Sequence, residues 1–406
     1  MTLDERLARR MAGMKASEIR ELLKLLDRPD IISFAGGIPD PALFPQEAFR
    51  AAFDGLLVGG AGAAALQYSV SEGYLPLRAW LAEHMAALGV PCTPDNILIT
   101  SGSQQALDYL GKLFVSPGDT VLLGWPTYLG ALGAFNAYEP HYEQLTPQGN
   151  RSAAAYQAAA RAAGGQAKMA YLSVDFANPT GETLARSARE AVLDLADEMD
   201  IAVVEDAAYQ ALRYDGAAIA PILALEIARK GNIDACRTLY CGSFSKTLAP
   251  GLRVGWVCAA RPLIARLVLM KQAADLHSAT INQMVVHRIA ADGFDAQVAK
   301  VRAVYAERRD HMLAALAREM PPGVTWTRPE GGMFIWLTLP PQMDGADLLA
   351  KSLETQKVAF VPGRAFFADG SNGNTLRLSF SCADATMIDE GIRRLGALLR
   401  AAGPAA

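Results

Sequence analysis

The sequence predicts an α/β protein with two parts: a large domain around a mostly parallel, doubly wound sheet, and a smaller α+β domain. From Asn96 to Val257 short apolar runs alternate with helical patterns, which is typical of strand–helix–strand units. After Glu319 this rhythm changes to that of a smaller α+β unit. The length of 406 residues also exceeds that of one typical domain, so two substructures are expected.

From the N-terminus onward, the elements are expected in the following order. An amphipathic helix opens the chain over residues 16–26, because Ile19, Leu22, Leu23 and Leu26 recur at helical spacing. An irregular stretch rich in Gly and Pro follows over residues 34–45. The alternating part then contains the strand ILIT and the helix SQQALDYLGKLF, the strand TVLLG and a helix from about Tyr128, the strand MAYLSV and the helix ARSAREAVLDLADEM, and the strands AVVEDA, TLYCGS and VGWVCA.

Two long helices are expected next, from about Arg261 to Ala291 and from Asp295 to Glu319. The smaller domain then contains the strands MFIWLTL, VAFVP and TLRLSFS, with helices near residues 347–354 and over residues 385–399. The N-terminal segment is expected to complete it. The predicted division is therefore an N-terminal segment over 1–44, a large domain over 45–292 and a small domain over 293–406.

Composition excludes several classes of protein. A hydrophobic fraction of 51% and a charged fraction of 20% are those of an ordinary globular chain. The net charge of −4 gives no reason to expect a nucleic-acid or membrane surface. The N-terminus has no apolar signal region, and no apolar run reaches the ~18 residues of a membrane span. The five cysteines are scattered and lack metal-ligand spacing, which favours reduced thiols, no metal and a cytoplasmic location.

The most specific segment is SFSKTLAPGLRVG, which begins at Ser243 and follows the strand TLYCGS. It places Lys246 at the end of a strand among hydroxyls and small residues, with Ser245 before it and Arg253 shortly after it. A single lysine on a loop is usually a solvated surface residue. This environment is unusual for such a residue, so Lys246 is a candidate for chemistry.

Two further candidates follow neighbouring strands. Asp206 ends the apolar strand of IAVVEDAAY, where a buried carboxylate without a partner would be costly. Glu205 competes with it, but adjacent strand residues face opposite ways, so only one can point at a ligand. Asn178 in FANPTG follows the strand MAYLSV, and one crossover helix separates it from Asp206. Both residues therefore emerge where open α/β sheets bind ligands, although NPTG alone is a plain turn signal and Asp206 could simply cap a turn.

The segment TSGSQQA, from Thr100 to Ala106, joins a strand to a helix. Backbone N–H groups around Gly102 and Gln104, together with the Ser103 hydroxyl, converge on the helix N-terminus, which favours a phosphate. The alternative is that Ser103 is an ordinary helix cap. Ser243, Ser245 and Arg253 would add a charged partner and several neutral donors.

From Ala16 to Arg394 the chain resembles the class I/II aminotransferases of fold type I, and within them the bacterial 2-aminoadipate and the kynurenine/aminoadipate aminotransferases. One departure is Ala207-Ala208, where many members have Asp-Pro or Asp-Ala, and it leaves the substrate preference open. The segments that carry the resemblance are ASEIRELLKLLDRP, ISFAGGIPDPALFP, LQYSVSEGY, GSQQALD, FANPTGE, VVEDAAY, GSFSKTLAPGLRVGW, GGMFIW, VAFVPGRAFF and NTLRLSFS.

The resemblance implies a pyridoxal 5'-phosphate (PLP)-dependent transaminase and a role for each candidate residue in holding PLP. Lys246 would bind PLP covalently and later act as the general base. Asp206 would keep the ring nitrogen protonated, so that the ring can accept negative charge. Tyr209 and Asn178 would contact the 3'-oxygen, and Tyr128 would stack on the ring. The phosphate would lie among Gly102, Ser103, Gln104, Ser243, Ser245 and Arg253, with Tyr68 contributed by the partner subunit of a homodimer.

The substrates implied are an L-amino acid and a 2-oxo acid such as 2-oxoglutarate. Arg377 would hold the α-carboxylate with its planar fork beside Asn178, although an arginine on a strand can also extend to solvent. Arg20, near Ser17 on the opening helix, would meet the distal carboxylate of an acidic substrate, and Gly37 would let the backbone approach it. Branched-chain, aromatic or alanine donors remain alternatives. A PLP-sensing regulatory module is a remote one, because only about 15 residues precede the first aminotransferase-like helix.

Overall fold

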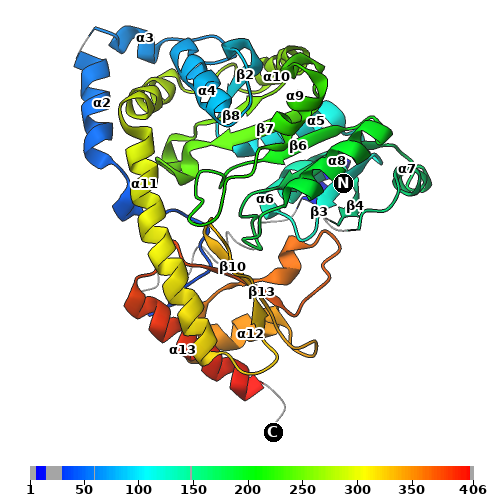
Figure 1. The fold of residues 1–406 in the computed structure, drawn as a ribbon, viewed down its shortest axis with the longest axis vertical. Helices are drawn as coiled ribbons and strands as arrows, with labels where there is room; N and C mark the ends of the chain where they lie inside the picture. Colours follow the sequence, from blue (N-terminus) through cyan, green and yellow to red (C-terminus); the bar gives the residue numbers. More distant parts are fainter. Residues whose placement is uncertain (1–5, 15–29, 59, 147–148, 403–406) are drawn as a thin grey trace.

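The structure is a computed structural model that describes residues 6–14, 30–58, 60–146 and 149–402. The predicted opening helix over residues 16–26, with Ser17 and Arg20, lies outside the described residues. Figure 1 shows a larger part built around one sheet and a smaller part below it, with the long helix α11 (Thr280–Glu319) running from one to the other. The predicted α/β class is confirmed.

A seven-stranded sheet forms the centre of the larger part, in the order β2-β8-β7-β6-β5-β3-β4. The sheet is parallel except for β8, which runs antiparallel to both of its neighbours. β4 was not among the predicted strands, because most of its residues are not buried and HYEQL contains no apolar run. The strands are β2 (Ile97–Thr100), β3 (Thr120–Gly124), β4 (His141–Leu145), β5 (Ala167–Ser173), β6 (Ala202–Asp206), β7 (Thr238–Ser243) and β8 (Gly255–Cys258).

Helices cover both faces of this sheet. Side chains of α5, α6 and α10 pack on one face, and those of α7, α8 and α9 pack on the other. The first helices after the N-terminal segment are α2, α3 and α4, and α4 joins the second face near β2. Their bounds are α2 (Gln46–Val58), α3 (Gly62–Leu66), α4 (Leu75–Ala87), α5 (Ser103–Phe114), α6 (Leu129–Phe135), α7 (Ala153–Ala162), α8 (Arg186–Met199), α9 (Ile222–Lys230) and α10 (Arg261–Ala274).

The two long helices are divided at a different place from the prediction. α10 ends at Ala274 and α11 begins at Thr280, whereas the predicted break near residues 292–294 is only a kink at Gly293. The true break contains no Gly or Pro to signal it. The helix ends locally, since the backbone N–H groups of Asp275 and Leu276 both bond the Lys271 carbonyl and Leu276 adopts a positive φ of 66°. Tertiary contacts also hold the break, because the side chains of Ser101 and Gln105 bond Asp275.

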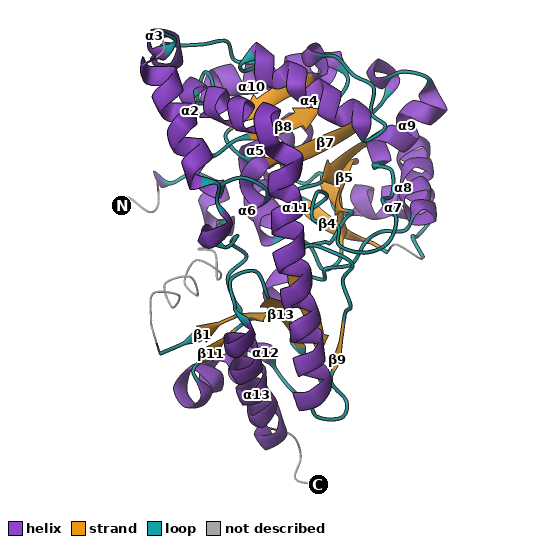
Figure 2. Cartoon of the chain, turned by 60° about the vertical axis from the view of Figure 1, so that its left-hand side comes forward, coloured by secondary structure: helices purple, strands orange, loops and turns teal. Residues whose placement is uncertain are grey.

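The smaller part is an antiparallel four-stranded sheet in the order β12-β13-β10-β9, covered by helices (Figure 2). The N-terminal strand β1 (Ile32–Ser33) pairs in parallel with β11 (Val358–Ala359). The predicted strand VAFVP is therefore two short strands, β11 and β12, in different sheets, which corrects the prediction. The remaining elements are β9 (Thr325–Trp326), β10 (Phe334–Thr338), β12 (Val361–Pro362), β13 (Thr375–Ser379), α12 (Gly345–Lys351), followed by a π-helical turn over Ser352–Gln356, and α13 (Ala385–Ala402).

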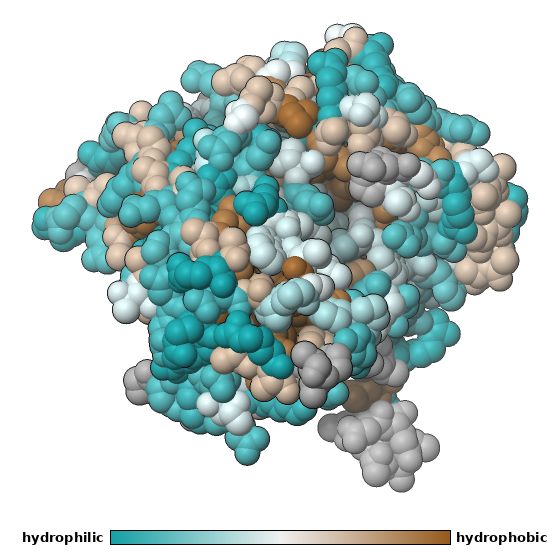
Figure 3. Space-filling model, turned by 60° about the horizontal axis from the view of Figure 1, so that its bottom comes forward, coloured by the Kyte–Doolittle hydropathy of each residue, from teal (hydrophilic) through white to brown (hydrophobic). Residues whose placement is uncertain are grey.

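Hydrophilic and hydrophobic residues are interspersed on the face of the molecule shown in Figure 3. This mixture is ordinary for a globular protein, since apolar atoms make up much of any protein surface. Within the described ranges, no helix is both long and apolar enough to cross a membrane.

Candidate active site

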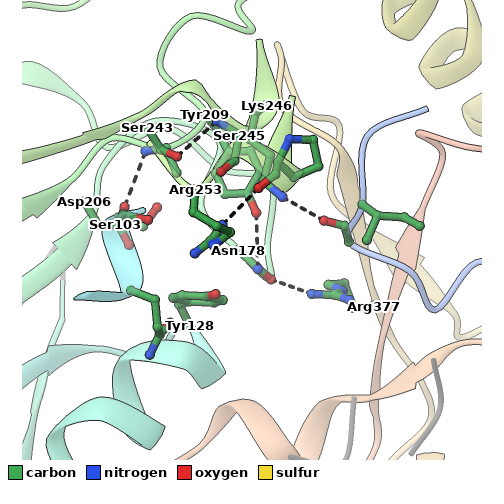
Figure 4. A pocket seen from close by; sticks show the side chains of 16 residues that line it. Ser103, Tyr128, Asn178, Asp206, Tyr209, Ser243, Ser245, Lys246, Arg253 and Arg377 are labelled. Atoms are coloured by element: carbon green, nitrogen blue, oxygen red, sulfur yellow. Dashed lines mark hydrogen bonds between the residues drawn. The ribbon is translucent and has the colours of Figure 1, made fainter. Parts of the chain in front are cut away.

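A cavity of about 230 Å³ lies at the carboxyl ends of β5, β6 and β7, on the side facing the smaller part (Figure 4). Four lining residues were not predicted to belong to the site: Ile38, Ser173, Pro250 and Ala208, of which Ala208 was noted only as a departure from the family pattern. The lining residues that were predicted are Gly37, Ser103, Gln104, Tyr128, Asn178, Asp206, Tyr209, Ser243, Ser245, Lys246, Arg253 and Arg377.

Lys246 ends a short 3-10 turn, Phe244–Lys246, that directly follows β7. The Ser243 hydroxyl shapes this turn by accepting a 3.1 Å hydrogen bond from the Ser245 backbone N–H. Nζ of Lys246 donates a 2.9 Å bond to the carbonyl of Gly37. Burial and the positive charges of Arg377 and Arg253 lower the pKa of Lys246 to about 8. The amine is therefore much more easily neutral than that of an ordinary lysine.

Asp206 and Glu205 point to opposite sides of β6. Asp206 lines the cavity, whereas Glu205 accepts hydrogen bonds of 2.9 and 3.1 Å from the backbone N–H groups of Ile222 and Leu223 at the start of α9. Glu205 thus satisfies unpaired donors of a helix N-terminus. Burial raises the pKa of Asp206, and the hydrogen bond from Tyr171 opposes that rise.

Tyr171 is a residue of this site that the sequence analysis missed. Its hydroxyl donates a 2.7 Å hydrogen bond to Oδ2 of Asp206, and both side chains are buried. The available signal was a phenol in the middle of an otherwise apolar strand, β5. A buried tyrosine hydroxyl needs a partner, and here that partner is the carboxylate that faces the cavity.

Arg377 on β13 is 1% exposed, so the alternative that it extends to solvent is wrong. Nη1 donates 2.7 Å to Oδ1 of Asn178, and Nη2 donates 2.8 Å to the carbonyl of Ala35. The guanidinium also lies 4.3 Å from the centre of the Phe334 ring. Nε has no partner, and no acidic side chain of the described residues is within ion-pair distance of Arg377. A buried cation without a carboxylate partner indicates a site for an anionic ligand.

The two side walls of the cavity carry aromatic rings and an amide. Tyr128 directly precedes α6, and Tyr209 lies in the turn after β6. The Asn178 amide donates a long 3.5 Å bond to the Tyr209 hydroxyl. Burial raises the pKa of both phenols, so both hydroxyls stay protonated at neutral pH. In the view of Figure 4, Tyr128 lies across the cavity from Lys246.

A second arginine of the cavity, Arg253, lies at the N-terminus of α5. Gly102 precedes this helix with a φ of +80°, and a Cβ there would lie 2.3 Å from Nη2 of Arg253. Only glycine therefore fits this close approach. Ser103 begins the helix and lines the cavity. The Gln104 amide also reaches the cavity wall, but it donates a 2.7 Å bond to the carbonyl of Gly130.

Of the predicted site residues Gly37 and Tyr68, only Gly37 lines the cavity. Gly37 lines the cavity, and a Cβ there would lie 3.2 Å from the Phe334 ring and 3.6 Å from Nη2 of Arg377, so the backbone approaches closely. Tyr68 is 80% exposed, does not line this cavity, and contacts the ring of His277 edge-on at 5.9 Å. One chain alone therefore does not bring Tyr68 to its own site.

No group of histidine, cysteine and acidic side chains that could hold a metal ion occurs in the part of the chain that the structure describes. All five cysteines are free thiols. The polar groups of the cavity are thus two arginines, a lysine, a carboxylate, phenols, hydroxyls and two amides. This set suits an organic ligand with two anionic ends.

Comparison with known proteins supports this description. The family of class I and II aminotransferases matches residues 30–395. The chain is 45% identical to the 2-aminoadipate transaminase of Thermus thermophilus, over 95% of this chain and 94% of that protein. It is 42% identical to aromatic-amino-acid aminotransferase 1 of Thermococcus litoralis, over 96% and 92% of the two chains.

One solved structure carries a ligand that bears on the cavity. It is the alpha-aminoadipate aminotransferase LysN of Thermus thermophilus, complexed with N-(5'-phosphopyridoxyl)-L-leucine, and it covers 99% of both chains at 41% identity and a TM-score of 0.88. The family match and these identities extend over nearly the whole chain. The chain therefore belongs to the class I and II aminotransferases, PLP-dependent transaminases of fold type I.

Proposed function

We propose that this enzyme transfers the amino group between acidic L-amino acids, 2-aminoadipate and glutamate, and 2-oxo acids such as 2-oxoglutarate. Leucine and aromatic amino acids are further substrates in this proposal. The relatives support this breadth: the aminoadipate aminotransferase of Thermus thermophilus is named for 2-aminoadipate and was solved with a leucine adduct, and the Thermococcus litoralis enzyme is named for aromatic amino acids. A branched-chain, aromatic or alanine preference is the alternative.

The observation that carries the proposal is that Arg377 and Lys246 line the same cavity. Arg377 is a buried cation without a carboxylate partner among the described residues, and Lys246 is an amine with a pKa lowered to about 8. An amino acid has a carboxylate for the first group, and its α-proton can be taken by the second. Asn178 positions Arg377 through the 2.7 Å bond, so it belongs to the same carboxylate site.

The residues of the cavity fit PLP. A phosphate is suited by the positive charge of Arg253, by the space that a Cβ at Gly102 would fill, and by the N-terminus of α5. We assign the phosphate to this end, among Gly102, Ser103, Gln104, Ser243, Ser245 and Arg253, and the ring nitrogen to Asp206. Lys246 is assigned as the residue that binds PLP covalently, Tyr209 and Asn178 as the partners of the 3'-oxygen, and Tyr128 as the stacking ring. When bound, PLP supplies an electron sink for the charge left when the α-proton departs.

Residues of the chain orient the substrate, move the α-proton and stabilise the charge of the cofactor ring. Arg377 and Asn178 hold the α-carboxylate and thereby orient the α-carbon. Lys246 Nζ takes the α-proton and holds it, because its lowered pKa makes the neutral amine accessible near neutral pH. The hydrogen bond from Tyr171 favours the ionised form of Asp206, and this negative charge makes a positive charge favourable at the ring nitrogen.

We also infer that the active unit is a homodimer. The segment around Tyr68 exposes several large apolar side chains, which a partner subunit would cover. Tyr68 does not reach the cavity of its own chain, which is consistent with a role in the partner's phosphate site. The exposed apolar residues of the segment around Tyr68 are Leu57, Val58, Leu66, Tyr68, Val70 and Leu75.

We place the enzyme in the cytoplasm, and its five free cysteines are compatible with that compartment.

The domain division proposed is 1–44, 45–292 and 293–406. It is supported by the pairing of β1 with β11 and by the kink of α11 at Gly293, a few residues before α11 joins the core of the smaller part at Val301. Ser17 and Arg20 of the N-terminal segment are proposed to contact the distal end of an acidic substrate, with Gly37 forming the adjacent wall.

Trapping and a substrate panel test this proposal. Purified protein should show a visible absorption band, and borohydride should fix the cofactor covalently to Lys246, as mapped by peptide mass spectrometry. A panel of amino donors with 2-oxoglutarate should then give turnover with 2-aminoadipate, glutamate and leucine. A label on another lysine would reject the assignment of Lys246. Turnover of alanine with none of 2-aminoadipate would reject the proposed substrates.

A further inference from the structure

A polar cluster built around a buried lysine lies behind the α5 end of the cavity and takes no part in the roles assigned above. It consists of Ser101, Gln105, Lys271, Asp275 and Ser278, hereafter the Lys271 cluster. The Lys271 side chain is 0% exposed, although lysine is among the residues least often buried. None of the five residues lines the cavity. A buried lysine this close to an active site therefore calls for a physical reason.

The ammonium group of Lys271 is fully hydrogen-bonded. Nζ donates hydrogen bonds of 2.9 Å to Oε1 of Gln105, 3.0 Å to each carboxylate oxygen of Asp275, and 2.9 Å to the hydroxyl of Ser278. These partners belong to α5, to the C-terminus of α10 and to the break before α11. The charge of Lys271 is compensated locally by Asp275, so the cluster as a whole adds little net charge to the cavity.

The cluster dictates the orientation of the Gln105 amide. Lysine can only donate and an ionised aspartate can only accept, so Oε1 must face Lys271 and Nε2 must face Asp275. Nε2 donates a 2.7 Å bond to Oδ2 of Asp275 accordingly. With the amide held this way, Oε1 is also free to accept a 2.8 Å bond from the backbone N–H of Ser101. A flipped amide would place a donor against each of these donors.

Ser101 is the point at which the cluster meets the cavity wall. Its hydroxyl lies 3.2 Å from Oδ2 of Asp275 and 3.0 Å from the Ser278 hydroxyl. Its carbonyl accepts a 3.4 Å bond from Nη2 of Arg253. The backbone N–H, the hydroxyl and the carbonyl of Ser101 are therefore all held, and the next two residues are Gly102 and Ser103. The cluster thus sets the path of the backbone that presents α5 to a ligand.

We infer that Lys271 is a positioning residue for the phosphate group of the cofactor and acts through Gln105, Asp275 and Ser101. This inference rests on the phosphate placement proposed above. Without the ammonium group, the Gln105 amide is no longer oriented, and the Ser101 N–H loses a partner that is fixed in place. The loop can then rotate away from the geometry that its donors and Arg253 require. A purely structural role in joining α10 to α5 would instead affect every ligand of the cavity alike.

The variant Lys271→Met tests this distinction because it keeps the length of the side chain and removes its donors. PLP is removed from the holoenzyme, and the affinity is measured for PLP and for pyridoxal, which lacks the phosphate. The expected result is a loss of about tenfold or more in PLP affinity with pyridoxal affinity unchanged. Lys230→Met is the matched control, since Lys230 lies on the far helix α9 and pairs with Asp197 and Glu226. It should change neither affinity.

Asp275→Asn provides a second variant if Lys271→Met does not fold, because Asp275 is partly exposed and asparagine keeps its shape. A smaller loss confined to PLP is expected there. Equal losses for PLP and pyridoxal, or no loss for PLP in a folded variant, would overturn the inference. Failure of the proposed function itself is distinguishable, since wild-type protein would then bind neither PLP nor pyridoxal at Lys246.

Discussion

The hydroxyl of Tyr171 donates a 2.7 Å hydrogen bond to Oδ2 of Asp206 across the neighbouring parallel strands β5 and β6. The other oxygen, Oδ1, accepts a long 3.4 Å bond from the backbone N–H of Ala208. Burial raises the pKa of the Asp206 carboxyl, and these two bonds lower it. Tyr171 therefore helps to keep Asp206 ionised inside the protein, which is the state that a protonated ring nitrogen requires.

Tyr171→Phe should weaken catalysis without unfolding the protein, because phenylalanine fills nearly the same volume. The lost charge-assisted bond is worth roughly 1.5–3 kcal/mol, which corresponds to about a ten- to hundredfold decrease in kcat/KM. The active form has an ionised Asp206, and the variant raises the pKa of this group. The acidic limb of the kcat/KM profile should therefore move to higher pH. The profile is measured from about pH 5 to about pH 9.

Tyr156→Phe is the matched control for this variant. Tyr156 is also buried, and its hydroxyl donates a 2.7 Å bond to the carbonyl of Gln144, away from the cavity. It should leave the pH profile in place. An acidic limb that stays unchanged in Tyr171→Phe would show that the phenol has no influence on Asp206.

Asp206 and Glu205 should separate cleanly into a catalytic and a structural residue. Asp206→Ala should reduce kcat by on the order of 10²–10³-fold with a nearly unchanged Tm, because the ring nitrogen loses its anion. Glu205→Ala should lower the Tm, since the two N-terminal amides of α9 lose their acceptor, a loss of ~1–2 kcal/mol for a helix cap. Activity and thermal unfolding are measured on both variants. Near wild-type turnover of Asp206→Ala would show that the reaction does not depend on an anion at Asp206.

Lys246 should make the stability of the cofactor-free protein depend on pH. The pKa of Lys246 is about 8 in the folded protein, whereas an ordinary lysine has a pKa of 10.5, so between these values the unfolded chain binds more protons than the folded chain. The free energy of unfolding should therefore rise with pH through this window, and the full penalty should apply below pH 8. Lys246→Met should stabilise the cofactor-free protein by on the order of 3 kcal/mol near pH 7, and the gain should vanish above pH 10.5. The measurement is Tm against pH for both proteins, and a constant difference between them would contradict the lowered pKa.

Much of the fold follows from local pattern, and the exceptions have tertiary causes. The buried strands from β2 to β8 are apolar runs, so they were predictable, whereas the partly exposed β4 lacked that signal. The break between α10 and α11 was misplaced because Gly293 only kinks α11. The chain breaks instead at Asp275, where the partners of Lys271 and the Ser101 loop decide the conformation.

The site shows the same division between local and tertiary information. Lys246, Asp206 and Asn178 follow strands, so their approach to one another could be predicted from the order of strands and helices. The choice between Asp206 and Glu205 required the position of α9, which occupies Glu205. Tyr171 and Lys271 were missed because each acts through a partner on another element, and no spacing in the sequence reveals such a contact.

The preference for acidic substrates should depend on Arg20, which lies outside the described residues and whose role rests on the resemblance to 2-aminoadipate aminotransferases. A charge-assisted hydrogen bond to the distal carboxylate is worth roughly 1.5–3 kcal/mol. Arg20→Ala should therefore lower kcat/KM for 2-aminoadipate and glutamate by about ten- to a hundredfold. Leucine makes no use of this charge, so its kcat/KM should change little.

Arg50→Ala is a suitable control for this comparison, because Arg50 is an exposed arginine of α2 that pairs with Glu47 and is remote from the cavity lining. It should leave all three substrates unaffected. The decisive quantity is the ratio of kcat/KM for 2-aminoadipate to that for leucine in each protein, since a general loss of folded enzyme cancels in this ratio. An equal loss for the acidic and the apolar substrates in Arg20→Ala would show that Arg20 supports the site without recognising the distal carboxylate.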